Sequence, residues 1–66
     1  MNSNMKRIRE KNGKTLNDVA NESGLNYTTI MRIEKGLIIP KINTAQKIAN
    51  ALNTPIEELF DLKEID

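Results

Sequence analysis

Apolar residues recur along this chain at intervals of three and four positions, which is the period of an amphipathic α-helix. Met5 and Ile8 begin the pattern, and Asn12-Gly13 follows it with residues suited to a left-handed turn. The pattern therefore predicts a first helix at about residues 3–12.

Capping signals mark the next two predicted helices. Thr15 can accept a hydrogen bond from a first-turn amide, and Asp18 places a negative charge where the helix dipole favours it. We expect this second helix to end at Ser23-Gly24. Asn26 is the next expected cap, and it starts a third helix over residues 27–35.

Two further helices complete the pattern. The fourth is predicted at about residues 42–52, with its apolar positions at Ala45, Ile48, Ala49 and Leu52. For the fifth, Thr54 can serve as the cap, Pro55 suits the first helical position, and Glu57 lies three residues after the cap. Its inward positions are Ile56, Leu59 and Phe60. Five short helices predict a single all-α domain over residues 1–66.

The connection between the second and third predicted helices is very short, and its residues suit a steep crossing. Ala20 is small where the two backbones must approach, and Gly24 tolerates the positive φ needed to leave the first of them. The apolar positions that can close the angle are Val19, Leu25, Ile30 and Ile33. This arrangement predicts a helix-turn-helix over residues 16–35.

Composition and charge narrow the class of protein. The chain has no cysteine and no histidine, so a disulfide framework or a metal site built on those residues is excluded. No apolar run approaches the ~20 residues of a membrane-spanning helix, and the first residues are not signal-like, so we expect a cytoplasmic protein. Residues 1–41 carry eight Lys/Arg against four Asp/Glu, whereas residues 42–66 carry two against five. This imbalance suggests a polyanion-facing side, although it could also be an uneven surface without consequence.

The motifs resemble those of the lambda-repressor-like helix-turn-helix family of Cro/C1 (XRE-like) regulators. The resemblance covers residues 5 to about 60 and rests on MKRIRE, TLNDVANESGL, NYTTIMRIEKG, the proline at 40 and TAQKIANALNTPIEELF. It implies a five-helix DNA-binding domain with the helix-turn-helix in its second and third helices.

In this family the third helix is the recognition helix, and its first turn enters the major groove of double-stranded DNA. The resemblance implies base contacts by five residues, namely Tyr27, Thr28, Thr29, Met31 and Arg32. Arg32 can donate two hydrogen bonds to guanine, while threonine methyls and Met31 can touch thymine methyls. Tyr27 could instead bond a phosphate or pack on the preceding helix, and the threonines could be filler near a cap.

Phosphate contacts are expected at helix N-termini and on flanking polar residues. The candidates are Lys14, Thr15, Leu16, Asn26, Lys35, Lys41 and Asn43. The family often has glutamine where this chain has Leu16, so only the backbone amide of Leu16 can serve. The resemblance also implies a partly buried, structural ion pair between Arg9 and Glu34.

The segment GLIIP at residues 36–40 departs from the family, whose members more often have polar residues there. We expect one of its three large apolar residues to enter the core between the third and fourth helices. The others would form a dimer surface, with Leu37 and Ile38 as the candidates. The alternative is that all three pack internally.

The sequence thus predicts a sequence-specific DNA-binding transcriptional regulator, of repressor type, that binds an inverted-repeat operator as a homodimer. A phage, a mobile element or a bacterial chromosome could encode it. A protein-interaction or adaptor module without specific DNA binding is the alternative, favoured by a net charge of only +1 and the apolar GLIIP segment. An enzyme is not expected, because the paired carboxylates Glu57 and Glu58 lie in a solvated first turn, where acidic residues simply favour the helix dipole. Neither a cofactor nor a metal is expected.

Overall fold

The computed structural model describes residues 4–64, and these residues form five α-helices and one short 3-10 helix. The elements are α1 (Met5–Lys11), α2 (Leu16–Ser23), α3 (Tyr27–Glu34), α4 (Ile42–Ala51), α5 (Ile56–Leu59) and η1 (Leu62–Glu64). The prediction of a five-helix, all-α fold is confirmed. Helix bounds agree with the prediction within about two residues, and the predicted start of the first helix at residue 3 lies outside the described residues.

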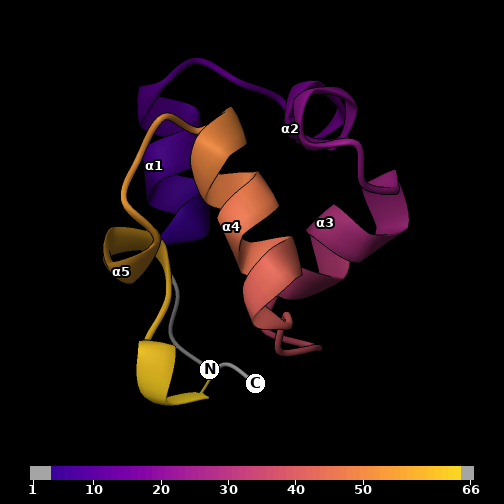
Figure 1. Cartoon of the computed structure of the whole chain (residues 1–66). Helices are drawn as coiled ribbons and strands as arrows, with labels where there is room; N and C mark the ends of the chain where they lie inside the picture. The colour runs from indigo at the N-terminus through magenta and orange to yellow at the C-terminus, as the bar shows by residue number, and fades with distance from the viewer. Residues whose placement is uncertain (1–3, 65–66) are drawn as a thin grey trace.

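Helix α4 lies in the middle of the fold, with α1 and α5 on one side and α2 and α3 on the other (Figure 1). It packs against α2 and α5, so its apolar residues hold the two halves together. The buried core consists of Met5, Ile8, Val19, Ala20, Ile30, Ile33, Ala45, Ile48, Ala49, Leu52, Leu59 and Phe60. These positions are all apolar positions of the helical pattern or of the predicted helix crossing, whereas Leu25 and Ile56, also expected to face inward, are only partly buried.

The start and end of α2 are formed as the sequence predicts. The side chain of Thr15 accepts a hydrogen bond from the amide of Asp18 at 3.0 Å, and the Asp18 carboxylate accepts one from the amide of Thr15 at 2.9 Å. This reciprocal pair is a capping box. At the other end, Gly24 has a φ of 74°, a left-handed conformation in which a Cβ would be strained.

Asn26 occupies the N-cap position of α3, as predicted, although its side chain makes no capping hydrogen bond. The predicted cap of α5 is wrong. Thr54 does not cap α5, which begins after Pro55. The hydroxyl of Thr54 instead donates to the carbonyl of Leu52 at 2.9 Å, because the end of α4 presents unpaired carbonyls closer to it.

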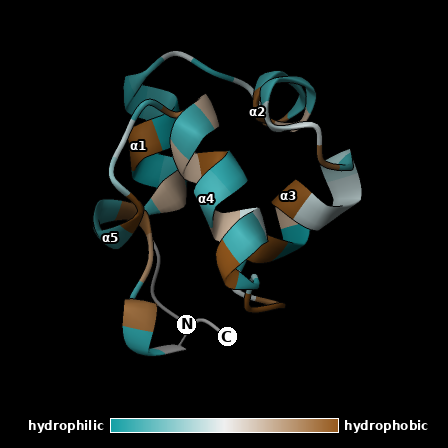
Figure 2. Cartoon of the chain, viewed as in Figure 1, coloured by the Kyte–Doolittle hydropathy of each residue, from teal (hydrophilic) through white to brown (hydrophobic). Residues whose placement is uncertain are grey.

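The prediction that one apolar residue of the GLIIP segment enters the core is also wrong, as is the alternative that all three pack internally. Leu37, Ile38 and Ile39 are 68%, 39% and 49% exposed. Pro40 is the buried residue of this loop. Figure 2 shows hydrophobic colour gathered where the loop joins α4, whose first residue, Ile42, is also 48% exposed. We call Leu37, Ile38, Ile39 and Ile42 the apolar loop patch.

Within residues 4–64, no helix has both the length and the apolar character needed to cross a bilayer.

The capping box makes the stability of the domain depend on pH. Two hydrogen bonds from Thr15, first from its amide and then from its hydroxyl, hold the pKa of Asp18 below its ordinary value, and nearby Lys14 acts in the same direction. A lowered pKa in the folded state means that the ionised carboxylate stabilises the fold above the ordinary value of about 3.9. That contribution is lost as the pH falls through the lowered pKa.

We therefore expect Asp18→Asn to flatten the acid limb of stability. Chemical denaturation at a series of pH values from about 6 down to about 2 should show a shallower loss of unfolding free energy than in the wild type. Glu57→Gln removes an exposed carboxylate of α5, in a groove that Thr15 and Asp18 do not line, and serves as the matched control. Equal acid limbs for Asp18→Asn and wild type would contradict the role of the capping box.

Candidate nucleic-acid interface

Helices α2 and α3 meet across a three-residue connection, and buried residues on both helices fix the crossing. The amide of Leu25 donates to the carbonyl of Ala20 at 3.1 Å, which closes the turn directly after α2. Val19 on α2 and Ile30 and Ile33 on α3 are fully buried, and Leu25 packs against them at the edge of the core. The predicted helix-turn-helix is therefore present, and its rigid packing fixes which side of α3 faces outward.

The five predicted base-contact residues do not all lie on that outward side. Tyr27, Thr28 and Arg32 are exposed, whereas Thr29 and Met31 are half-buried. Thr28 and Arg32 are four residues apart, so they share one face of the helix, opposite the buried pair Ile30 and Ile33. Thr28 and Arg32 thus form the most accessible polar stripe on α3.

Tyr27 and Met31 lie on the neighbouring face of α3, towards the beginning of α2. Tyr27 is 47% exposed and lines an open groove with Leu16 and Asn17, at the N-terminal end of α2. Met31 lines a second groove, which it shares with Leu16 and Lys35 among others. Leu16 lines both grooves and packs against the hydrophobic core, so its side chain forms an apolar part of this face.

The N-terminus of α2 already holds an anion of its own. The amides of Thr15 and Asp18 are engaged in the capping box, and the Asp18 carboxylate supplies the negative charge that the helix dipole favours. The predicted phosphate contact through Thr15 would have to compete with this internal pair. The amides of Leu16 and Asn17, at the start of the helix, are the next candidates in the same turn.

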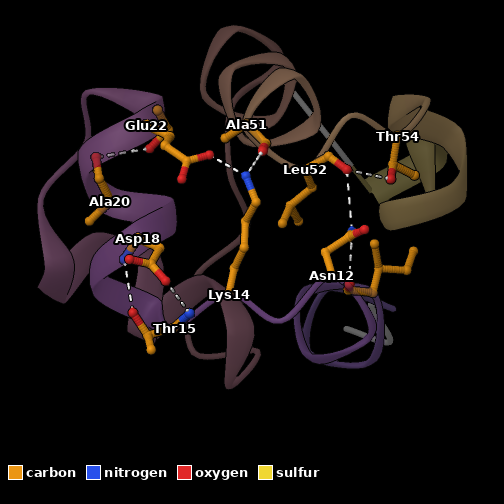
Figure 3. Close-up of polar contacts among 11 residues, drawn as sticks. Asn12, Lys14, Thr15, Asp18, Ala20, Glu22, Ala51, Leu52 and Thr54 are labelled. Carbon is orange, nitrogen blue, oxygen red and sulfur yellow. Dashed lines mark hydrogen bonds and ion pairs between the residues drawn. The ribbon is translucent and has the colours of Figure 1, made fainter.

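The other predicted phosphate contacts are placed in different ways. Asn26, Lys35, Lys41 and Asn43 are exposed, on either side of α3 and at the start of α4. Lys14 is not comparable. Its ammonium forms an ion pair with Glu22 and donates a hydrogen bond to the carbonyl of Ala51 at 2.9 Å, so it is used inside the fold (Figure 3).

The predicted ion pair between Arg9 and Glu34 is present. Two nitrogens of the guanidinium, Nε and Nη2, donate to one oxygen of the Glu34 carboxylate at 3.1 and 2.8 Å. The side chains are only 12% and 6% exposed, so water screens the pair poorly. Arg9 also donates from Nη1 to the carbonyl of Lys14 at 2.8 Å, a third hydrogen bond that no sequence pattern indicates. Arg9 thereby joins α1, the α1–α2 connection and α3.

Sequence reasoning missed a second group of structural polar residues. The side-chain amide of Asn12 donates to the carbonyls of Ile8 at 3.0 Å and Leu52 at 3.4 Å, so it bridges α1 and the end of α4. A signal was available, because Pro55 has no amide proton to offer the end of α4, and α4 has no basic residue in its last turn. Both facts predict donors from elsewhere in the chain.

This surface has the features of a recognition surface. Among residues 4–64, no three acidic side chains gather where they could hold a metal ion. An outward helix with a polar stripe, backed by a buried ion pair and flanked by lysines, is the geometry of a helix-turn-helix that reads a polyanion groove. The fold and this surface together define a helix-turn-helix DNA-binding domain.

Comparisons with known proteins give the family. The model of the helix-turn-helix family matches residues 5–59. Two uncharacterised HTH-type transcriptional regulators of Archaeoglobus fulgidus are 37% and 34% identical over 91% and 97% of this chain, covering 86% and 90% of their own lengths. An uncharacterised HTH-type transcriptional regulator of Methanocaldococcus jannaschii is 35% identical over 91% of each chain. The chain belongs to the helix-turn-helix family of DNA-binding transcription regulators, of the Cro/C1 type predicted from its motifs.

Glu34→Ala should destabilise the fold before it affects any surface. The substitution leaves the Arg9 guanidinium buried without its counter-charge, and breaking such a pair costs ~3 to 5 kcal/mol. Urea denaturation should show this loss in the free energy of unfolding. Glu10→Ala, which removes an exposed carboxylate of the same chemistry, should change it by less than ~0.5 kcal/mol. Similar stabilities for the two variants would show that the ion pair is dispensable.

Proposed function

We propose that this protein regulates transcription by binding a specific DNA sequence, an inverted repeat, as a homodimer. The observation that carries the proposal is the polar stripe of α3. Thr28 and Arg32 are exposed on a helix whose opposite face is fixed by fully buried Ile30 and Ile33. A rigid helix with an outward polar stripe can present the same side chains to the same base edges at every encounter.

Arg32 and Thr28, with Tyr27 at the start of the helix, are the proposed base contacts. An arginine can donate two parallel hydrogen bonds to the O6 and N7 atoms of guanine, and a threonine can contact any base through its hydroxyl or its methyl group. Thr29 and Met31 are half-buried, so we propose that they contact bases only at the edge of the interface with DNA. Tyr27 lies beside the start of α2, where its hydroxyl could reach a phosphate and so set the register of α3 in the groove.

Phosphate contacts are proposed on both flanks of α3. On one side lie Asn26 and the first amides of α2, including that of Leu16. On the other side lie Lys35 directly after α3, and Lys41 and Asn43 at the start of α4. Contacts on two flanks would seat the helix across both strands of one major groove, because phosphate contacts fix orientation while base contacts fix sequence.

The dimensions of the domain support two copies on one operator. The Cα atoms extend only 27 Å along the longest axis, whereas half-sites one helical turn apart lie about 34 Å from each other. A single copy therefore reads a single half-site. The apolar loop patch follows α3 directly along the chain, and we propose it as the contact between two copies, with Leu37 and Ile38 central. We further propose that the regulator acts in the cytoplasm as a repressor, by occupying a promoter.

One observation favours a second candidate, a protein-interaction module that has kept the fold without specific DNA binding. The apolar loop patch is exposed, and the formal net charge is only +1. A module of this kind would bind DNA weakly and without regard to sequence.

Selection of bound sequences from a random pool of duplex DNA tests the proposal. We expect recovery of an inverted repeat with half-site centres about one helical turn apart. The affinity of the recovered sequence should fall steeply with salt, because phosphate contacts release counterions. Weak retention with no enriched sequence would favour the interaction module and refute the proposed function.

Arg32→Ala should separate reading from folding. We expect specific binding to weaken by ~1 to 3 kcal/mol, with the melting temperature almost unchanged, because Arg32 is exposed. Lys47→Ala removes an exposed positive charge from α4 and is the matched control, expected to bind like wild type. A fall in melting temperature comparable to that of a core variant would show that Arg32 is structural.

Leu37→Asp should weaken self-association without unfolding the monomer. Leu37 is 68% exposed, so a carboxylate there is solvated in the monomer but desolvated between two copies. Sedimentation equilibrium, with and without the selected operator, measures the change. Leu62→Asp, at an apolar side chain of η1 that is 45% exposed, is the control and should leave the dimer intact. A wild-type protein that stays monomeric at high concentration in both conditions would rule out this interface.

A further inference from the structure

The carbonyl groups at the end of α4 are satisfied by donors from two parts of the chain, the residues that follow α4 and the α1–α2 connection. The carbonyls of Ile48, Ala49 and Asn50 accept from amides that follow them, those of Leu52, Thr54 and Asn53 respectively. The carbonyl of Ala51 has no such partner, because the residue four positions on is Pro55, which has no amide proton. Lys14 fills this position from the α1–α2 connection, with Nζ 2.9 Å from the Ala51 oxygen.

Lys14 also compensates charge at the end of α2. Glu22 lies in the last turn of α2, where the helix dipole disfavours a carboxylate, and that turn contains no basic residue. The ammonium of Lys14 pairs with this carboxylate from the opposite direction. Figure 3 shows Lys14 extended between the two helices, with its ammonium at the point where Glu22 and Ala51 come closest.

One cation thus joins the carboxyl ends of two helices, and neither helix has a basic residue of its own in its last turn. The side chain of Lys14 is only 28% exposed, so its aliphatic stem is largely covered. Loss of the charge would leave the Ala51 carbonyl and the Glu22 carboxylate facing each other without a donor between them. Helix α2 carries α3 through the rigid turn at Gly24, so a shift of α2 on α4 also moves α3.

We infer that Lys14 is a positioning residue: it sets the seat of α2 on α4, and thereby the aim of the DNA-reading face of α3, rather than binding a phosphate. The part of this inference that concerns DNA reading rests on the proposed function. The part that concerns the position of α2 on α4 rests on the bonds of Lys14 to Glu22 and Ala51. It replaces the sequence-based expectation that Lys14 is one of the phosphate contacts.

The two roles differ in what neutral variants do to DNA binding. Lys14→Met keeps an unbranched side chain and removes the charge. If Lys14 is a positioning residue, Lys14→Met should lower the affinity for the specific DNA sequence roughly 2- to 30-fold. This is the range for residues that act on a site without touching it. Sequence-independent binding and the slope of log affinity against log salt should stay as in wild type. A phosphate ligand would instead lower specific and non-specific affinity alike and reduce that slope by about 1.

Glu22→Gln is the sharper variant. It removes a negative charge, which by long-range electrostatics alone should tighten binding to DNA. A positioning role predicts the opposite, a loss of specific affinity in the same direction as Lys14→Met. The Glu22 side chain is 46% exposed, so this variant should fold even if Lys14→Met does not. Lys14→Arg keeps a cation at the site, so its specific affinity should lie closer to that of the wild type than the affinity of Lys14→Met does.

Backbone amide chemical shifts of the free protein provide an arm that needs no operator. In Lys14→Met and Glu22→Gln, shift changes should appear at the ends of α2 and α4 and continue into α3. In the control, Lys63→Met on η1, they should stay local. Unmoved α3 amides, or a salt slope reduced by about 1, would overturn the inference. If no DNA sequence is enriched by selection, the proposed function fails, while the chemical shifts still decide the role of Lys14.

Discussion

The interaction on which the rest of the domain depends is the three-bonded guanidinium of Arg9. It binds Glu34 at the end of α3 and the Lys14 carbonyl in the α1–α2 connection, and it is carried by α1. The residues joined lie 5 and 25 positions away along the chain. Because the site is mostly buried, each partner needs the others, and desolvation makes a partial set costly. This requirement fixes α3 relative to α1, and the ion pair does not occupy the outward face of α3.

A second set of polar bonds acts on the other half of the fold, at the carboxyl end of α4. Asn12 and Lys14 lie in the same four-residue connection to which Arg9 donates a hydrogen bond. The bonds of Arg9 and the bonds at the end of α4 are therefore linked through this connection. The connection between α1 and α2 is therefore not a spacer. It brings donors to carbonyls that Pro55 cannot serve, and it starts the capping box of α2 at Thr15. In a chain of 66 residues with a small core, such bonds specify how the helices meet.

The sequence was sufficient for the helices and for the part of the core that the helices supply, because both follow from the local period of apolar residues. Val19 and Ile48 are apolar at helical spacing, and each is fully buried. The failures involve choices between partners. Thr54 has the residue type of a cap, but it found a carbonyl of α4 instead. Residue type also did not indicate the partners of Lys14, which lie 8 and 37 residues away along the chain. The exposure of Ile39 and the burial of Pro40 were likewise decided by tertiary packing, which residue type alone does not encode.

These internal bonds change what the charge of the domain means. Arg9 and Lys14 count as cations in the composition, yet both are paired inside the fold, and Asp18 occupies the dipole at the start of α2. The exposed cations left for a polyanion near α3 are Arg32, Lys35, Lys6 in the groove that Met31 lines, and Lys41 at the start of α4. Few phosphate contacts give weak sequence-independent attraction, since that attraction grows with the number of charges neutralised. On the proposed function, discrimination between DNA sequences depends on how α3 is positioned, so the bonds that hold the helices together bear on recognition as much as on stability.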